Sequence, residues 1–339
     1  MKENLVIIFV IIGALIGAGF ASGQEIYSFF YAYGLKGLLG ITIMSILISI
    51  LIYKSLKIIC EKKVDNYQEF LKIFIKNEKI VKMINTILNI LLLVTFYIMI
   101  AGFGAYFEQE LGIAKIIGSI LLIIMCFAVF LTSIKGVLKV SEYLIPILIT
   151  FIIIIGIKSM STIDITHLEI PTIKKGWLLS GITYCSYNLI LLIPVLISLR
   201  NHIKKQEDIK YISIFSGVII LILSSIIFIL LTKADTDLSL LEMPVVYIIR
   251  TQFTQFHKIY AFTILAAIFT TAISIGIGFL KNIKTKKISY PQLVSLMCIS
   301  SLIISDFGFS KLINIAYPLF GYIGIIQIIL ILSKNICKK

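Results

Sequence analysis

"GALIGAGFASGQEI", residues 13–26, lies inside the first long apolar segment and holds four glycines, a serine, a glutamine and a carboxylate. Glycine costs about 1 kcal/mol relative to alanine inside a helix, so Gly17, Gly19 and Gly23 make a local break inexpensive. In hydrocarbon, non-helical backbone is tolerated only where protein or a water-filled cavity surrounds it. The stretch therefore predicts an interrupted membrane helix beside a binding cavity.

The composition sets the class of the fold. The 339 residues are 59% hydrophobic and 14% charged, with a mean hydropathy of +1.05, whereas soluble domains are about 25% charged. Apolar runs of about 20 residues recur along the chain, which predicts an all-α polytopic membrane protein. We expect about ten transmembrane helices, over residues 5–33, 37–59, 83–107, 113–132, 137–157, 177–199, 211–232, 258–280, 289–305 and 312–333.

The net charge of +14 has a topological explanation. The 31 Lys and Arg residues gather in alternate connecting segments, whereas the 17 acidic residues divide almost evenly between the two sides. This asymmetry follows the positive-inside rule, so we expect a multi-pass protein of the plasma membrane with both termini cytoplasmic. The basic excess therefore does not indicate a nucleic-acid partner.

The chain reads as one membrane domain, residues 1–339, with two extramembrane features besides an extended outer stretch at 158–176. Residues 61–83 carry apolar side chains at helical spacing between lysines. This cytoplasmic amphipathic segment either lies on the inner leaflet or packs on neighbouring loops. Residues 237–253 are expected to form one or two short helices that cap the outer face.

The order of the spans suggests a duplication. Five spans in residues 5–157 precede the outer stretch and five follow it in residues 177–333, which predicts a 5+5 inverted repeat. The first span of the second half contains "SGITYCSYN", residues 180–188. Interrupted spans at corresponding positions of two repeats indicate a transporter binding site. We therefore predict that the first and sixth spans are both interrupted.

Glu25 is the strongest single indication of function. A carboxylate inside a membrane span is costly and usually functional, here as a proton acceptor, a gate partner or a ligand for an amine. The glycines alone leave a second explanation open, because Gly13 and Gly17, like Gly19 and Gly23, also fit close helix packing. Glu25 itself also fits a charge at the outer end of the helix, in a wet vestibule.

The stretch at 13–26, followed by "FFYAYGLKGLLG" and supported by "YCSYN" at 184–188, resembles the YkvI-type bacterial membrane proteins. These look like distant members of the amino acid–polyamine–cation superfamily, which has the leucine-transporter (LeuT) fold. The resemblance implies unwound first and sixth spans around a substrate. It implies the following substrate-binding residues: Gly17, Ala18, Gly19, Phe20, Ala21, Ser22, Gly23, Gln24, Glu25, Tyr97, Thr183, Tyr184, Tyr187 and Asn188. For Tyr97, core packing is an equal alternative.

The eighth span also resembles this fold, at the segment that binds sodium. By this resemblance Ala267 would offer its carbonyl and Thr270 and Thr271 their hydroxyls, and the carbonyls of Gly13 and Ile16 would complete the shell. Oxygen ligands suit a hard cation such as Na⁺. Threonine hydroxyls also commonly bond to their own helix. Proton coupling and the absence of a coupling ion are therefore alternatives, and no other cofactor is expected.

These features predict an ion-coupled secondary transporter of a small amino-acid-like or amine solute, working by alternating access. The sequence departs from the best-known amino acid transporters of the resembled fold, because no arginine follows the break and Gln24 and Glu25 stand there instead. This departure puts recognition of a simple zwitterion in doubt and leaves room for an amine-bearing or neutral solute. The alternative is a transporter-fold receptor or assembly component that binds a small ligand without moving it. An enzyme is not expected, because Glu25 lacks partners for acid–base chemistry. The expected partners are the solute and the bilayer, and the sequence predicts no oligomeric state.

Overall fold

The computed structural model describes residues 2–132, 135–160, 170–203, 205–283 and 288–334. These residues form helices joined by short loops, and the one β-bridge among them links Tyr33 and Thr172. The first half contains α1 Lys2–Leu15, α2 Ala18–Ala21, α3 Gln24–Ile26, the π-helix η1 Tyr27–Tyr31, α4 Lys36–Lys62, α5 Tyr67–Lys72, α6 Glu78–Leu111, α7 Lys115–Thr132 and α8 Lys135–Met160. The second half contains α9 Trp177–Leu199, η3 Arg200–His202, α10 Gln206–Leu231, η4 Leu238–Leu240, α11 Pro244–Gln252, α12 Thr254–Asn282, α13 Tyr290–Ser305 and α14 Phe309–Ser333.

The helices are those of a multi-pass membrane protein. Within the described residues, six are long and apolar enough to span a bilayer, and four shorter apolar helices cover residues 3–15, 115–131, 146–159 and 290–305. Many large apolar side chains are exposed on the outside of the bundle, such as Ile124 and Phe262, as expected where lipid is the solvent. The all-α membrane class is confirmed, whereas ten crossings and a 5+5 repeat remain predictions.

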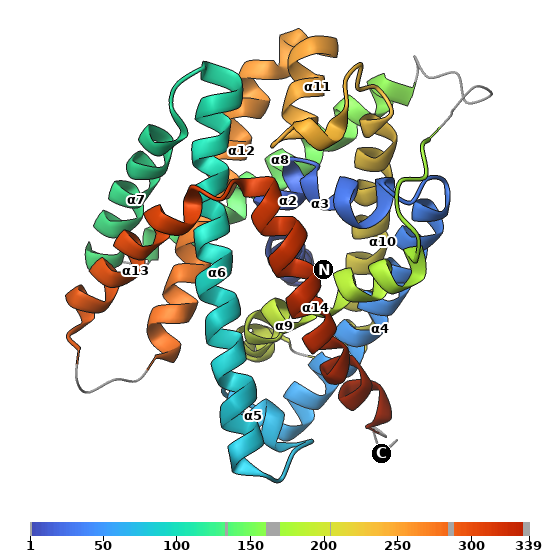
Figure 1. The fold of residues 1–339 in the computed structure, drawn as a ribbon. Helices are drawn as coiled ribbons and strands as arrows, with labels where there is room; N and C mark the ends of the chain where they lie inside the picture. Colours follow the sequence, from blue (N-terminus) through green and yellow to red (C-terminus); the bar gives the residue numbers. More distant parts are fainter. Residues whose placement is uncertain (1, 133–134, 161–169, 204, 284–287, 335–339) are drawn as a thin grey trace.

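The broken first segment lies in the middle of the bundle. Figure 1 shows α6 as a long upright helix, with α7 and α13 on one side of it and α4 and α10 on the other. The short helices α2 and α3 lie between these groups, and α14 passes in front of them. α1 contacts α8, α9 and α10, so the first segment is surrounded by protein.

Small residues hold α9 between α4 and α14. A side chain at Gly181 would lie 3.1 Å from the carbonyl oxygen of Gly40, and one at Gly321 would overlap Thr183. One at Gly324 would lie 2.8 Å from the carbonyl oxygen of Ser186. Glycines allow helix backbones to approach closely in membranes, and here they press α9 against both neighbours.

The predicted interruption of the sixth span is wrong, because α9 is a continuous α-helix from Trp177 to Leu199. Its polar side chains bond to carbonyls of the preceding turn: the hydroxyl of Thr183 donates to Leu179, that of Ser186 to Ile182, and the amide of Asn188 to Tyr184. Side chains satisfied in this way need neither a break nor a cavity. The polar residues of this span therefore do not indicate a break.

The two extramembrane features have different surroundings. In the predicted cytoplasmic segment 61–83, α5 buries Tyr67, Phe70 and Leu71, and the Tyr67 hydroxyl donates to Gln327 of α14 at 3.0 Å. These contacts favour packing against the protein over a position on the leaflet. Residues 237–253 form η4 and α11. Residues 161–169 of the predicted outer stretch lie outside the described residues.

Candidate functional site

The first membrane segment is interrupted twice, as its glycines predict. α1 ends at Leu15, and Gly17 has an extended backbone (φ −86°, ψ −173°) that separates α1 from the buried short helix α2, which contains Ala18 and Phe20. Gly23 then adopts a left-handed conformation (φ 82°) before α3. L side chains rarely adopt such a conformation, so glycine is required at this second break.

Protein groups, and not an open cavity, satisfy two carbonyls freed by the second break. The hydroxyl of Tyr260 on α12 donates to the carbonyl of Ala21 at 2.5 Å. The backbone N–H of Val245 in α11 donates to the carbonyl of Ser22 at 2.9 Å. α11 therefore lies directly over the break, whereas the sequence predicted solvated backbone there.

Glu25 lies immediately after the second break and is 3% exposed. One of its carboxylate oxygens accepts hydrogen bonds from two hydroxyls of α9, Tyr187 at 2.6 Å and Tyr184 at 3.0 Å. The other carboxylate oxygen lies against Gly19, where a Cβ atom would overlap it. Gly19, Glu25, Tyr184 and Tyr187, four of the predicted site residues, thus form one site.

An aromatic shell surrounds this carboxylate. The ring of Tyr187 stacks on Tyr317 of α14 with centroids 4.5 Å apart and lies 5.3 Å from Tyr184. From the π-helix η1, Phe29 and Phe30 pack edge-on against Tyr184, at 5.3 and 5.1 Å. The carboxylate is therefore enclosed by rings from three parts of the chain.

No cation balances Glu25 among the residues that the structure describes, since its contacts are the two tyrosine hydroxyls. Its neighbour Gln24 is also buried, and the amide oxygen of Gln24 has no hydrogen-bond partner in this part of the chain. An isolated buried charge is strongly unfavourable. The site therefore has the chemistry to bind a cation, an ammonium group or a proton.

The remaining predicted substrate residues are more dispersed. Thr183 and Asn188 lie on the same helix as the two tyrosines, but their polar groups bond to α9 itself. Tyr97 of α6 is 8% exposed, and its hydroxyl lies 2.7 Å from that of Ser300 on α13. The structure does not bring Tyr97 to the Glu25 shell.

The predicted sodium ligands are brought together only in part. Thr271 of α12 lies beside the first break, with its methyl 4.0 Å from where a side chain at Gly17 would begin. The hydroxyl of Thr270, however, donates to the carbonyls of Ala266 and Ala267 in its own helix. Within the described chain, no group of three or more His, Cys, Asp or Glu side chains could hold a metal ion. Sodium binding by Gly13, Ile16, Ala267, Thr270 and Thr271 remains a prediction.

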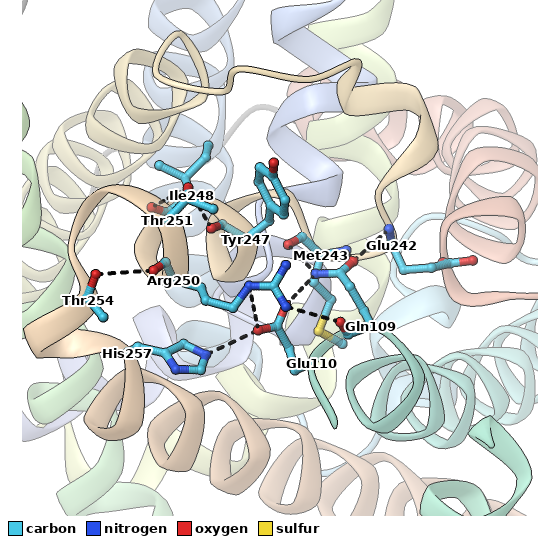
Figure 2. Close-up of polar contacts among 10 residues, drawn as sticks. All are labelled: Gln109, Glu110, Glu242, Met243, Tyr247, Ile248, Arg250, Thr251, Thr254 and His257. Carbon is cyan, nitrogen blue, oxygen red and sulfur yellow. Dashed lines mark hydrogen bonds and ion pairs between the residues drawn. The ribbon is translucent and has the colours of Figure 1, made fainter. Parts of the chain in front are cut away.

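A polar cluster at the end of α6 holds α11 over the break (Figure 2). The side chain of Glu110, which is fully buried, lies 3.1 Å from His257 and 3.7 Å from Arg250. The amide oxygen of Gln109 accepts hydrogen bonds from the backbone N–H groups of Glu242 and Met243, just before α11. These bonds tie α6, α11 and α12 together.

Local sequence does not predict this cluster. The available signal was the polar run Glu108–Gln109–Glu110 at the end of an apolar span, followed 140 residues later by Arg250 in the predicted capping helices. Pairing these groups requires knowing that α6 and α11 meet, which local sequence does not reveal.

No protein-family model matches the chain, but two full-length relatives do. It is 29% identical over 334 residues to the uncharacterized membrane protein YkvI of Bacillus subtilis, covering 98% of this chain and 94% of YkvI. It is 28% identical over 334 residues to the uncharacterized B. subtilis protein YyaD, covering 97% of this chain and 96% of YyaD. The chain is thus a homologue of these proteins, which confirms the YkvI-type resemblance.

Solved structures share the fold. The chain superposes on a crystal structure of a mutant manganese transporter from Eremococcus coleocola with a TM-score of 0.59 at 14% identity, covering 97% of this chain and 78% of that one. A second structure of that transporter, in complex with an aromatic bis-isothiourea substituted compound, gives 0.56 at 12% identity with the same coverage. At these identities the likeness concerns the fold alone.

Proposed function

We propose that this homologue of YkvI and YyaD is an ion-coupled secondary transporter of a small amino-acid-like or amine solute. The observation that carries the proposal is the buried Glu25 carboxylate after the double break of the first span, held by two tyrosine hydroxyls. Discontinuous helices with substrate and ion sites near the midplane are typical of secondary transporters. The fold shared with a manganese transporter supports the same class.

The chemistry of the site favours an amine or a proton over a divalent metal. Glu25 offers one carboxylate, and the groups that touch it are phenol hydroxyls on aromatic rings. Ammonium groups are attracted both to carboxylates and to aromatic faces. Manganese, the cargo in the name of the structural neighbour, prefers several carboxylate, carbonyl or water ligands. We therefore assign Glu25 to an ammonium-bearing solute or to the coupling proton.

The broken and continuous helices suggest how alternating access works. α2 and α3 are short and a glycine precedes each of them, so they can tilt relative to α1, whereas α9 is fixed by close contacts with α4 and α14. We propose a 5+5 inverted repeat with ten crossings, both termini cytoplasmic, in the plasma membrane. The first segment then moves against a static α9.

Counterflow in proteoliposomes tests the proposal. Vesicles are loaded with unlabelled amino acids or putrescine, and uptake of the labelled compounds is measured with and without Na⁺ and at two pH values. We expect counterflow of at least one compound, at least tenfold slower in Glu25→Gln and unchanged within twofold in Glu108→Gln, an exposed carboxylate of α6. If the wild-type protein exchanges none of these compounds under any condition, the proposed transport function is wrong.

A ligand receptor is the second candidate, because aromatic rings enclose Glu25 closely. A receptor would bind an amino acid or amine at Glu25 without moving it across the bilayer. Comparing ligand binding with counterflow distinguishes the two functions. For a receptor, a compound raises the melting temperature of the wild type but not of Glu25→Gln. The same compound shows no counterflow in the vesicles.

A further inference from the structure

A small pocket lies just outside the aromatic shell of Glu25. Its volume is about 120 Å³, and its walls come from the end of the first segment, the beginning of α9 and α14. Since a water molecule occupies about 30 Å³ of liquid, the pocket has room for a small polar group. Phe29 forms part of the wall and also packs against Tyr184 and Tyr187, so a single ring separates the pocket from the Glu25 shell.

The mouth of the pocket is positively charged. Lys174 and Lys175 both line it and are exposed. The ammonium group of Lys174 lies 3.5 Å from the carbonyl oxygen of Ser28. Neither lysine has a carboxylate within ion-pair distance among the residues that the structure describes. Two cations without a counter-charge beside a cavity favour an anionic ligand.

The beginning of α9 adds to the positive electrostatic potential of the two lysines. α9 is 23 residues long and starts after Gly176, which has no side chain to cap it. The first N–H groups of an α-helix lack partners within the helix and carry a partial positive charge, which favours anions. Gly176, Leu179 and Ser180, from the first turn and its cap, all line the pocket.

Ser28 provides an independent sign of a ligand. This residue lines the pocket and is 6% exposed. Its hydroxyl is buried and has no hydrogen-bond partner within the described part of the chain. A buried hydroxyl without a partner is unfavourable, and a ligand oxygen in the pocket would accept its hydrogen bond.

We infer that this pocket binds an anionic oxygen group, a carboxylate or a phosphate, through Lys174, Lys175 and the start of α9. For an amino-acid-like solute, the carboxylate occupies the pocket while the amine points past Phe29 toward Glu25. That orientation rests on the proposed function, whereas the anion binding itself does not. The anionic group can come from a soluble carboxylate or from a lipid headgroup.

Trp177 allows a direct test, because it is the chain's one tryptophan and follows Gly176 of the pocket. Its fluorescence is titrated with sodium acetate at constant ionic strength, and in nanodiscs of phosphatidylglycerol compared with phosphatidylcholine. We expect a saturable change whose half-saturation concentration rises at least tenfold in Lys174→Gln/Lys175→Gln. The half-saturation concentration should stay within twofold of the wild-type value in Lys174→Arg/Lys175→Arg, which keeps both charges. It should also stay within twofold in Lys36→Gln, a control at an exposed lysine outside the pocket.

The outcomes identify the source of the anion. A lysine-dependent response to acetate supports a soluble carboxylate, and a lysine-dependent response to phosphatidylglycerol alone supports a lipid headgroup. No response to either, or an equal response in the double Gln variant, overturns the inference. Glu25→Gln should retain the acetate response, because acetate has no amine to reach Glu25. Loss of counterflow in this variant with an unchanged acetate response would therefore separate the transport proposal from the anion-binding proposal.

Discussion

The first segment and α9 face each other across Glu25, and both contain glycine and polar residues, yet only the first is broken. α1–α3 use glycines at positions where the backbone leaves the helix, at Gly17 and Gly23. α9 places its glycine, Gly181, against the backbone of α4, and bonds its hydroxyl and amide groups to its own carbonyls. The same residue types thus interrupt the first segment but leave α9 continuous and closely packed.

The contrast has a functional consequence. The carboxylate is on the broken element, and the hydroxyls that hold it are on the continuous one. A movement of α2 and α3 would change the distance between Glu25 and its two tyrosines while α9 stays in place. Under the proposed transport function, occupancy of Glu25 by a cation or proton would thereby be coupled to the position of the first segment.

The largest effect is expected at Gly19, which lies directly against the Glu25 side chain. In Gly19→Ala, the added methyl overlaps the Glu25 side chain, and overpacking of this kind costs about 1 to 3 kcal/mol. We expect a loss of about 2 kcal/mol in the free energy of unfolding, measured by denaturant titration in mixed micelles.

Gly17→Ala is the matched control, because the nearest atom to its new methyl is the Thr271 methyl at 4.0 Å. It should change the free energy of unfolding by less than about 0.5 kcal/mol. Equal effects of the two alanines would show that Gly19 does not accommodate the carboxylate.

The next effect concerns the link between the two regions. In Tyr187→Phe the ring stays stacked on Tyr317 but the 2.6 Å hydrogen bond to Glu25 is lost. Hydrogen bonds to charged groups contribute about 1.5 to 3 kcal/mol, so we expect a loss near the lower value. A double-mutant cycle with Glu25→Leu, whose side chain has no acceptor for the hydroxyl, measures it.

Tyr317→Phe serves as the comparison, because the Tyr317 ring lies in the same stack without a hydrogen bond to Glu25 among those described. The coupling energy with Glu25→Leu should then be close to zero. A coupling as large as that of Tyr187 would mean that ring packing, and not the hydroxyl, connects α9 to the carboxylate.

The smallest effect is expected inside α9. Ser186→Ala removes a hydroxyl that bonds to Ile182 of the same helix. Such bonds contribute little to helix stability, so the free energy of unfolding should change by less than about 0.5 kcal/mol and counterflow should stay within twofold. A loss of transport comparable to that of Glu25→Gln would place Ser186 in the solute path and reopen the question of a break in α9.

The sequence predicts the first segment well because its signals are local. Glycine spacing around Gly19 indicates the break, and a carboxylate in an apolar span indicates that Glu25 has a special environment. The prediction for the sixth span is wrong because Ser186 and Asn188 can either line a cavity or bond to their own helix. Composition does not distinguish these two arrangements. The Glu110 cluster depends on contacts between α6, α11 and α12, which only the tertiary structure reveals.

The π-helix η1, residues Tyr27–Tyr31, lies between Glu25 and the loop that leads to α4. A π turn completes one turn of the helix with one more residue than the corresponding α turn. Deleting one residue there would convert the turn to an ordinary α turn and leave the segments on either side in nearly the same orientation. A relative one residue shorter at this point would therefore keep its acidic group at the same place in the fold, so a gap in this short window marks a change that the site can absorb.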